Sequence, residues 1–243
     1  ARIVNNTIAG NVTATAIQSD SSDITIINNI ISNNNAGIDC EGAGLRIDFN
    51  NLWHSIGGED YVGSTLSGSH DISAYPNFVS DNDFHLLSNS LCLDAGDPVE
   101  TLTGDYTMGS TLTVNESTNL VVDDRIWIAD GSNTETDIIT GFAAASVDIL
   151  GQFMNSYLVV DSPIVFTITS DASNEPAPGD SRIDMGAYGN TGEAGPAVVT
   201  CNRDLDKDGD VDGADLAAVV EYSGPVDLLP AFALEFGSTD CSE

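Results

Sequence analysis

Six aspartates near the C-terminus have the spacing that a calcium ion requires of a twelve-residue loop. Carboxylates stand at loop positions 1, 3, 5, 9 and 12, position 7 offers its backbone carbonyl, and glycine occupies position 6. Calcium takes six to eight oxygen ligands, and Gly209 permits the sharp turn that brings them together. The sequence therefore predicts a site for Ca²⁺ as the cofactor, with the ligands Asp204, Asp206, Asp208, Asp210, Asp212 and Asp215.

The residues around this loop predict two short helices. Val211 stands at loop position 8, and an apolar stretch with helical spacing follows the loop over 216–222. Asp227 can cap a second helix, whose apolar residues continue to Phe236. The alternative is an acidic turn that stays solvated and binds no ion, but the glycine, Val211 and the apolar stretch favour the ion site.

The loop and its helices resemble the dockerin modules that close many secreted bacterial proteins. The resemblance covers roughly residues 201–243 and rests on Asp215 at position 12 and Val211 at position 8. It implies an extracellular or cell-surface protein. Dockerins carry two such loops and often a Ser-Thr pair that binds the partner, whereas this chain has one loop and Gly213-Ala214 at those positions. The resemblance therefore does not extend to binding a cohesin.

The net charge of −32 excludes several kinds of partner. Six basic residues stand against 38 acidic ones, so the surface would repel nucleic acid and anionic membranes. No run of about 20 apolar residues predicts a membrane span. We expect calcium or high salt around the protein, and the acidic surface of a halophile is the alternative. No signal peptide is visible, so we expect a processed or partial product.

An internal repeat of about 22 residues runs through residues 1–60. Asparagine pairs recur at 5/6, 28/29 and 50/51, each inside a short apolar run. Such runs, separated by Gly, Asn, Ser and Asp, predict strands and turns. A period this short suits a parallel β-helix, in which coils stack and the asparagine side chains bond from coil to coil. A leucine-rich repeat is the alternative, but its spaced leucines are absent.

The repeat resembles the right-handed parallel β-helices that include pectate lyases and many bacterial surface proteins. The resemblance continues through 71–98 and implies that these residues form the last coils. It also implies a closing motif, which is found at 182–188. The predicted fold class is therefore mainly β, with a short right-handed parallel β-helix over 1–100 and a closing segment and linker over 173–198.

Seven short strand patterns between the coils and the closing motif predict an inserted domain over 101–172. That number of strands suggests a small antiparallel barrel or sandwich. Trp127 is expected in its core, and binding of a sugar is the alternative. The last predicted domain, over 199–243, is the two-helix calcium module. The seven strand patterns begin at Thr111, Asn119, Arg125, Asp137, Ser146, Tyr157 and Ile164.

Four cysteines in an acidic, apparently extracellular chain predict disulfide bonds. Cys201 and Cys241 bracket the calcium module, so a bond between them would join its two ends. Cys40 and Cys92 would form the second bond if their coils are adjacent, and two buried thiols are the alternative. No Cys-x-x-Cys or histidine-rich spacing indicates zinc.

Catalytic candidates are few. The β-helix resemblance implies polysaccharide lyase activity as one alternative. In such enzymes a basic residue takes a proton from a uronate of the substrate, which is bound to calcium. Arg46 is the weak candidate for that base, because acidic residues stand near it in the sequence. A resemblance in fold does not by itself establish an activity. The acidic neighbours are Asp39, Glu41 and Asp48, and the histidines, which lack metal or triad spacing, are His54, His70 and His85.

The first coil predicts a partner. A β-helix that starts at residue 1 without a cap leaves unpaired backbone groups. Either an upstream β-helix portion covers them, or another copy stacks there head to tail and builds filaments or a surface layer. We therefore expect a non-catalytic, extracellular, calcium-binding structural protein. The alternative is the C-terminal part of a secreted polysaccharide lyase or glycan-binding adhesin, with an extracellular polysaccharide as partner.

Overall fold

The computed structural model describes residues 1–20, 23–42, 44–53, 59–80, 82–115, 120–143, 145–176 and 182–195, together with 211, 213 and 236. The elements within these residues are strands and one short 3₁₀ helix, which confirms a mainly β chain. Across the same residues, no helix has the length and apolar character needed to cross a membrane.

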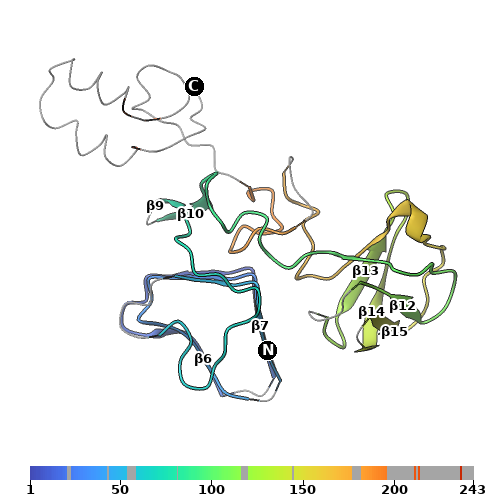
Figure 1. Ribbon diagram of the computed structural model, residues 1–243, viewed down its shortest axis with the longest axis horizontal. Helices are drawn as coiled ribbons and strands as arrows, with labels where there is room; N and C mark the ends of the chain where they lie inside the picture. The colour runs from blue at the N-terminus through green and yellow to red at the C-terminus, as the bar shows by residue number, and fades with distance from the viewer. Residues whose placement is uncertain are drawn as a thin grey trace, which may run out of the picture. The chain divides into compact units, whose positions relative to one another are not determined.

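The N-terminal part is a parallel β-helix of three coils, which Figure 1 shows end-on and superposed. β1, β4 and β7 form one parallel sheet, β2, β5 and β8 form a second, and β3 pairs with β6. Each strand thus pairs with the strand one repeat later in the sequence. The strands are β1 (Arg2–Val4), β2 (Thr7–Ala9), β3 (Thr15–Ser19), β4 (Asp23–Ile27), β5 (Ile30–Ser32), β6 (Ala36–Cys40), β7 (Gly44–Asp48) and β8 (Asn51–Trp53).

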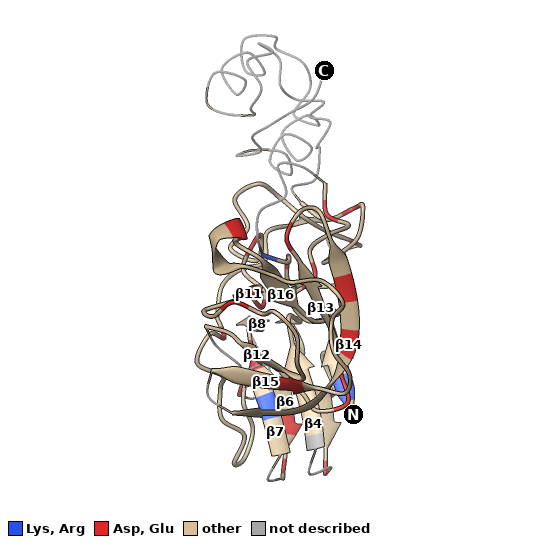
Figure 2. Ribbon diagram, turned by 90° about the vertical axis from the view of Figure 1, so that its right-hand side faces the viewer, with Lys and Arg blue, Asp and Glu red and all other residues tan. Residues whose placement is uncertain are grey.

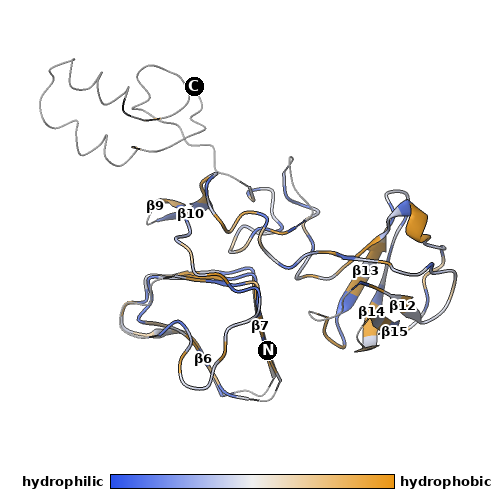
Figure 3. Cartoon of the chain, viewed as in Figure 1, coloured by the Kyte–Doolittle hydropathy of each residue, from blue (hydrophilic) through white to orange (hydrophobic). Residues whose placement is uncertain are grey.

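The interior of the coils is a stack of branched apolar side chains. Ile3, Ile26 and Ile47 occupy matching positions on β1, β4 and β7 and belong to one hydrophobic cluster. Their neighbours in sequence point to the other side of the strand, because side chains alternate along a strand. Orange and blue segments therefore both occur along the coils in Figure 3. Burying each such side chain contributes about 1.5–3 kcal/mol.

An asparagine ladder joins the coils at the turn between the first two strands of each coil. The Asn29 side-chain oxygen accepts the Asn6 backbone N–H at 3.0 Å, and Asn50 repeats this for Asn29 at 3.0 Å. Asp71 ends the series by accepting the Asn50 backbone N–H at 2.7 Å. The prediction that asparagines bond from coil to coil is therefore confirmed.

The predicted match of Asn50 and Asn51 to Asn28 and Asn29 is one residue too far along the chain. Register places Ile26 beside Ile47 and Ile30 beside Asn51, so Asn28 corresponds to Phe49 and Asn29 to Asn50. The backbone explains this: Asn28 has φ 58° and Phe49 has φ 53°. The turn requires a left-handed residue at that position, which asparagine adopts readily and phenylalanine rarely.

The sequence predicts that residues 71–98 form the last coils, but the structure departs from this. A partial fourth turn pairs Tyr61 with Ile38 and Ile72 with Asn51. β9 (Phe78–Ser80) and β10 (Asp83–Leu86) then form an antiparallel hairpin. Internal contacts place 77–90 in one compact unit with 195–243, and 1–76 with 91–194 in the other. The coil prediction is wrong for the hairpin, because alternating apolar residues suit either kind of strand pairing.

Two later segments, 91–98 and 182–188, run beside the coils. They pair with each other, since the Gly96 backbone N–H donates to the Ile183 carbonyl at 2.8 Å. Together they contact all three coils. The contacts are Asn51 Nδ2 to Cys92 Sγ at 3.1 Å, Asp97 N–H to Asn28 Oδ1 at 2.8 Å, and Ala187 N–H to Thr7 Oγ1 at 3.1 Å. The predicted closing motif therefore packs along the side of the coils.

A six-stranded antiparallel sheet follows between these two segments, in the order β11-β16-β13-β14-β15-β12. Of the seven strand patterns, the one from Tyr157 is wrong, because the chain forms the 3₁₀ helix η1 (Val159–Asp161) there. Residues 120–122 also lie outside any strand. The strands are β11 (Glu100–Thr101), β12 (Thr111–Thr113), β13 (Arg125–Ala129), β14 (Thr134–Ala143), β15 (Ser146–Ile149) and β16 (Ile164–Phe166).

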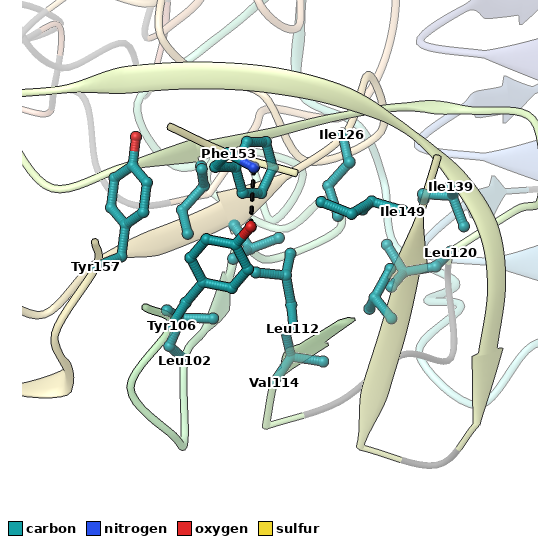
Figure 4. Close-up of a cluster of buried hydrophobic side chains, with 13 residues drawn as sticks. Leu102, Tyr106, Leu112, Val114, Leu120, Ile126, Ile139, Ile149, Phe153 and Tyr157 are labelled. Atoms are coloured by element: carbon teal, nitrogen blue, oxygen red, sulfur yellow. Dashed lines mark hydrogen bonds between the residues drawn. The ribbon is translucent and has the colours of Figure 1, made fainter. Parts of the chain in front are cut away.

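The sheet has its own hydrophobic core, shown in Figure 4. The Tyr106 hydroxyl lies within it, accepts the Phe153 backbone N–H at 2.8 Å and donates to the Gly109 carbonyl at 2.6 Å. A buried hydroxyl thus has both of its partners. Trp127 is only half-buried and stacks on Phe166 at 5.7 Å between ring centroids. The tryptophan therefore packs on the face of the sheet, and its predicted place in the core is wrong.

Cys40 and Cys92 are buried thiols in separate surroundings, in place of the predicted disulfide. Cys40 packs in the coil interior, where its backbone N–H donates to Thr65 Oγ1 at 2.8 Å. Cys92 lies outside the coils, against Asn51. Cys40 lies inside the coils and Cys92 on a segment outside them, which accounts for the missing bond.

Candidate functional site

The predicted calcium ligands lie outside the described residues. So do both cysteines of the predicted Cys201–Cys241 bond and most of the predicted two-helix module. Within the loop the structure describes Val211, which is fully buried, and Gly213, which is exposed. An apolar residue at loop position 8 is thus buried. The ion site itself stays a prediction.

Arg46 stands on β7 between Leu45 and Ile47, which pack on the interior cluster, so its side chain faces outward. Figure 2 colours the few basic residues of the ribbon blue. One Nη atom of Arg46 donates to the backbone carbonyl of Leu120, in the loop before β13. Burial lowers the pKa of Arg46 from its ordinary value, and the neighbouring Arg2 acts in the same direction, against Asp97 and Asp48. Of the three acidic residues expected beside it, Asp48 on the same strand is an electrostatic neighbour.

Arg2 makes a second contact to the same part of the inserted sheet. It forms an ion pair with Asp124, a carboxylate that is 8 % exposed. Asp124 stands directly before β13, and Leu120 lies four residues earlier in the same loop. Two arginines of the coils therefore hold the loop 120–124, and Arg46 acts as an anchor there, which does not suit a proton-accepting base.

The described histidines pair with neighbouring carboxylates. His70 Nδ1 lies 2.9 Å from Asp48 and 3.2 Å from Ser69 Oγ. Because both contacts use the same ring nitrogen, these residues do not form a serine–histidine–aspartate relay. His85 Nδ1 lies 2.5 Å from Asp83. His54 lies outside the described residues.

Three carboxylates meet where the closing segments come together. Asp94, Glu175 and Asp184 each offer an oxygen, and these oxygens lie within 4.8 Å of one another. Glu175 Oε1 accepts the backbone N–H of Asp184 at 3.0 Å and of Asn190 at 2.7 Å. The Asp184 side chain accepts the Asp94 backbone N–H at 2.7 Å. The cluster therefore connects three separate stretches of chain.

The electrostatics of this cluster disfavour three negative charges. Burial raises the pKa of Glu175, the negative charges of Asp184 and Asp94 raise it further, and the two backbone N–H groups oppose the shift. Sequence reasoning found the motifs that contain Asp94 and Asp184 but missed that they meet at Glu175. No local signal marks this, because the contacts join residues far apart in the chain.

Comparisons with known proteins give only weak similarities. No family model and no curated protein matches the chain. Among solved structures, the Gp54 tailspike of Acinetobacter baumannii bacteriophage AP22, in complex with A. baumannii capsular saccharide, aligns with a TM-score of 0.27 and 11% identity. That alignment covers 68% of this chain and 21% of the tailspike.

The tailspike gp61 of Pseudomonas phage phi297 aligns with a TM-score of 0.28 and 12% identity, over 62% of this chain and 23% of that one. The chain thus spans less than a quarter of either tailspike. Scores of this size carry no argument about fold or function. The parallel β-helix described above follows from the strand pairing alone.

Proposed function

We propose that this chain is a non-catalytic, calcium-binding structural protein of the extracellular space. The observation that carries the proposal is the spacing of the six aspartates from Asp204 to Asp215 around Gly209. Each alternate residue of such a loop supplies an oxygen to the same point, and the final carboxylate closes the shell. The ion would stabilise the C-terminal module by binding only its folded form.

The charge of the whole chain supports the same proposal. A net charge of −32 on 243 residues destabilises a compact state through self-repulsion unless cations screen or bind it. Calcium binding removes two units of negative charge at each site. A calcium-rich surrounding, such as the outside of a cell, would therefore favour the folded protein.

The described polar residues also favour a structural role over catalysis. Buried asparagines are used in the ladder, and Arg46 anchors a loop of the inserted sheet. The two described histidines are held by neighbouring aspartates. His70 contacts both Ser69 Oγ and Asp48 through its Nδ1, so this hydroxyl and imidazole do not form a nucleophile with a separately oriented base. The lyase alternative loses its one candidate residue on this account.

A calcium titration of the whole chain by calorimetry tests the ion site. We expect one binding event that the variant Asp208→Ala/Asp212→Ala loses. The matched control is Asp20→Ala/Asp161→Ala, which removes two exposed carboxylates elsewhere and should keep the event. Equal binding by the wild type and the loop variant would overturn the proposal, as would no binding by the wild type.

We also propose that copies assemble through the first coil. Among the described residues, β1, β2 and β3 pair with β4, β5 and β6 along one edge. An edge of this kind offers a row of backbone donors and acceptors to a further coil. Asn6 and Asn11 lie on it and donate to the coil above, at Asn29 and Asn34. Head-to-tail stacking of copies would repeat this pairing and build a filament.

A further inference from the structure

A groove lies between the outer side of the first sheet of the coils and the inserted sheet. It has a volume of about 600 Å³, within the range of small-molecule sites. The coils contribute Arg2, Thr25 and Arg46, and the inserted sheet contributes residues 120–123 and Phe142. All of these belong to the same compact unit. Neither the asparagine ladder nor the acidic cluster takes part in it.

The floor of the groove is a regular row of hydrogen-bonding side chains. Arg2 is in register with Thr25, and Thr25 with Arg46, on three neighbouring parallel strands. Neighbouring strands lie about 4.8 Å apart, so the two arginines are spaced by roughly 10 Å with a hydroxyl between them. The ion pair to Asp124 and the bond to the Leu120 carbonyl fix the guanidinium groups in place.

The opposite wall offers an aromatic face and an acceptor. Phe142 is 42 % exposed and stands near the end of β14. Asp123 lines the same groove, is exposed and has a left-handed backbone at φ 71°. The groove thus combines an apolar ring with donors and acceptors at fixed positions. A saccharide has the matching chemistry, because its C–H face packs on a ring while its hydroxyls both donate and accept.

The charges around the groove favour a neutral ligand. Four carboxylates, those of Asp48, Asp97, Asp123 and Asp124, lie on or near the two arginines. Together with the chain's net charge of −32, they repel polyanions such as polyuronates or nucleic acid. The two guanidinium groups disfavour a cation inside the groove. Because anions and cations are both disfavoured, we expect a polar ligand without charge.

We infer that this groove binds a neutral saccharide, with Phe142 packing on a sugar ring and Arg2, Thr25 and Asp123 bonding to hydroxyls. The site lies in the coils and the inserted sheet, so it does not depend on the calcium loop or on assembly. It gives the glycan-binding alternative a location, and it requires no bond to be made or broken.

The test is affinity electrophoresis of the whole chain through gels that contain one polysaccharide each. The neutral probes are xyloglucan, galactomannan, mixed-linkage β-glucan, starch and arabinoxylan, and the charged probes are polygalacturonate and alginate. We expect retardation by at least one neutral polymer and by neither charged polymer. Retardation by the charged polymers alone, or by none of the probes, overturns the inference.

Two variants locate the site. Phe142→Ala removes an exposed ring and should weaken binding of the retarding polymer at least tenfold. Leu150→Ala removes an apolar side chain that is 71 % exposed directly after β15, outside the groove, and should leave binding unchanged. Thermal unfolding of both variants verifies that they fold. Wild-type binding by a folded Phe142→Ala protein would show that the saccharide binds elsewhere.

Discussion

Asn29 is the residue on which the asparagine ladder depends most. It is fully buried, accepts hydrogen bonds from the backbone and side chain of Asn6, and donates to the Ile3 and Ile27 carbonyls and to Asn50. Removing the amide leaves several buried groups without a partner, and each such group costs about 1–3 kcal/mol. The fold of the coils therefore rests on side-chain amides as well as on apolar packing.

We predict that Asn29→Ala lowers the free energy of unfolding by about 2–4 kcal/mol, since more than one buried group loses its partner. Urea denaturation measures this loss in the free energy of unfolding. Asn11→Ala is the matched control: this residue is exposed at the first coil, and its loss should cost about 1 kcal/mol or less. Similar losses for the two variants would show that the ladder does not stabilise the coils.

Glu175 gives a prediction about pH. Because its pKa is raised in the folded protein, the ionised form is less favourable there than in the unfolded chain. This unfavourable contribution is present at neutral pH. It disappears as the pH falls through the raised pKa, and it is fully removed below the unfolded value of about 4.3.

Glu175→Gln keeps the oxygen that accepts the Asp184 and Asn190 N–H groups and removes the charge. We expect a higher melting temperature than the wild type at pH 7 and a difference that shrinks toward pH 4. Glu41→Gln, at an exposed position on the coils, should leave the melting curve at pH 7 nearly unchanged. A Glu175→Gln protein that is less stable than the wild type at pH 7 contradicts this account of the cluster.

Among the elements, the closing segments stabilise the β-helix from the side. Gly96 lets one of them approach closely: a Cβ there would lie 2.5 Å from Ile183 Cγ2 and 2.6 Å from the Ile183 carbonyl oxygen. The adjacent Asp97 is 3 % exposed and bonds to Asn28 and Thr169. Any displacement of Gly96 would therefore disturb buried hydrogen bonds.

We predict that Gly96→Ala destabilises the chain by roughly 2–4 kcal/mol, because backbone must move to admit the methyl group. Gly192→Ala is the matched control, since a Cβ there would meet nothing within 4 Å. Thermal or urea unfolding compares the two. Equal stabilities would mean that the closing segments can shift without cost and do not hold the coils.

Elements that depend on local pattern were predictable, and those that depend on distant contacts were not. The asparagine pairs revealed the coils because a buried amide needs a partner in the next coil. The third repeat is misaligned because Phe49 stands where the other coils have asparagine. Its left-handed backbone is imposed by the coil and is not indicated by its side chain. The hairpin β9–β10 and the turn at η1 have apolar alternation that suits other structures equally well.

The candidate sites divide in the same way. The calcium loop can be predicted from sequence because its proposed ligands lie within twelve residues of one another. The carboxylate cluster and the groove are assembled from residues that only the fold brings together. The sequence predicts Arg46 as a weak candidate for a base, but the side chain bonds to the Leu120 carbonyl. These two residues lie far apart in the chain, so no sequence spacing indicates this contact.

At the scale of the whole molecule, we propose a highly acidic β-helix whose first coil pairs with another copy when calcium is present. The net charge of −32 sets the repulsion that assembly must overcome. Calcium reduces this repulsion at each chain, whereas chelation restores it. Assembly and calcium binding should therefore rise and fall together.

The most direct measurement is the particle mass by light scattering in millimolar calcium and again after chelation. We predict large assemblies in calcium that dissociate to single chains on chelation, and single chains in both conditions for Asp208→Ala/Asp212→Ala. Single wild-type chains in both conditions would contradict the proposal of a calcium-linked structural polymer.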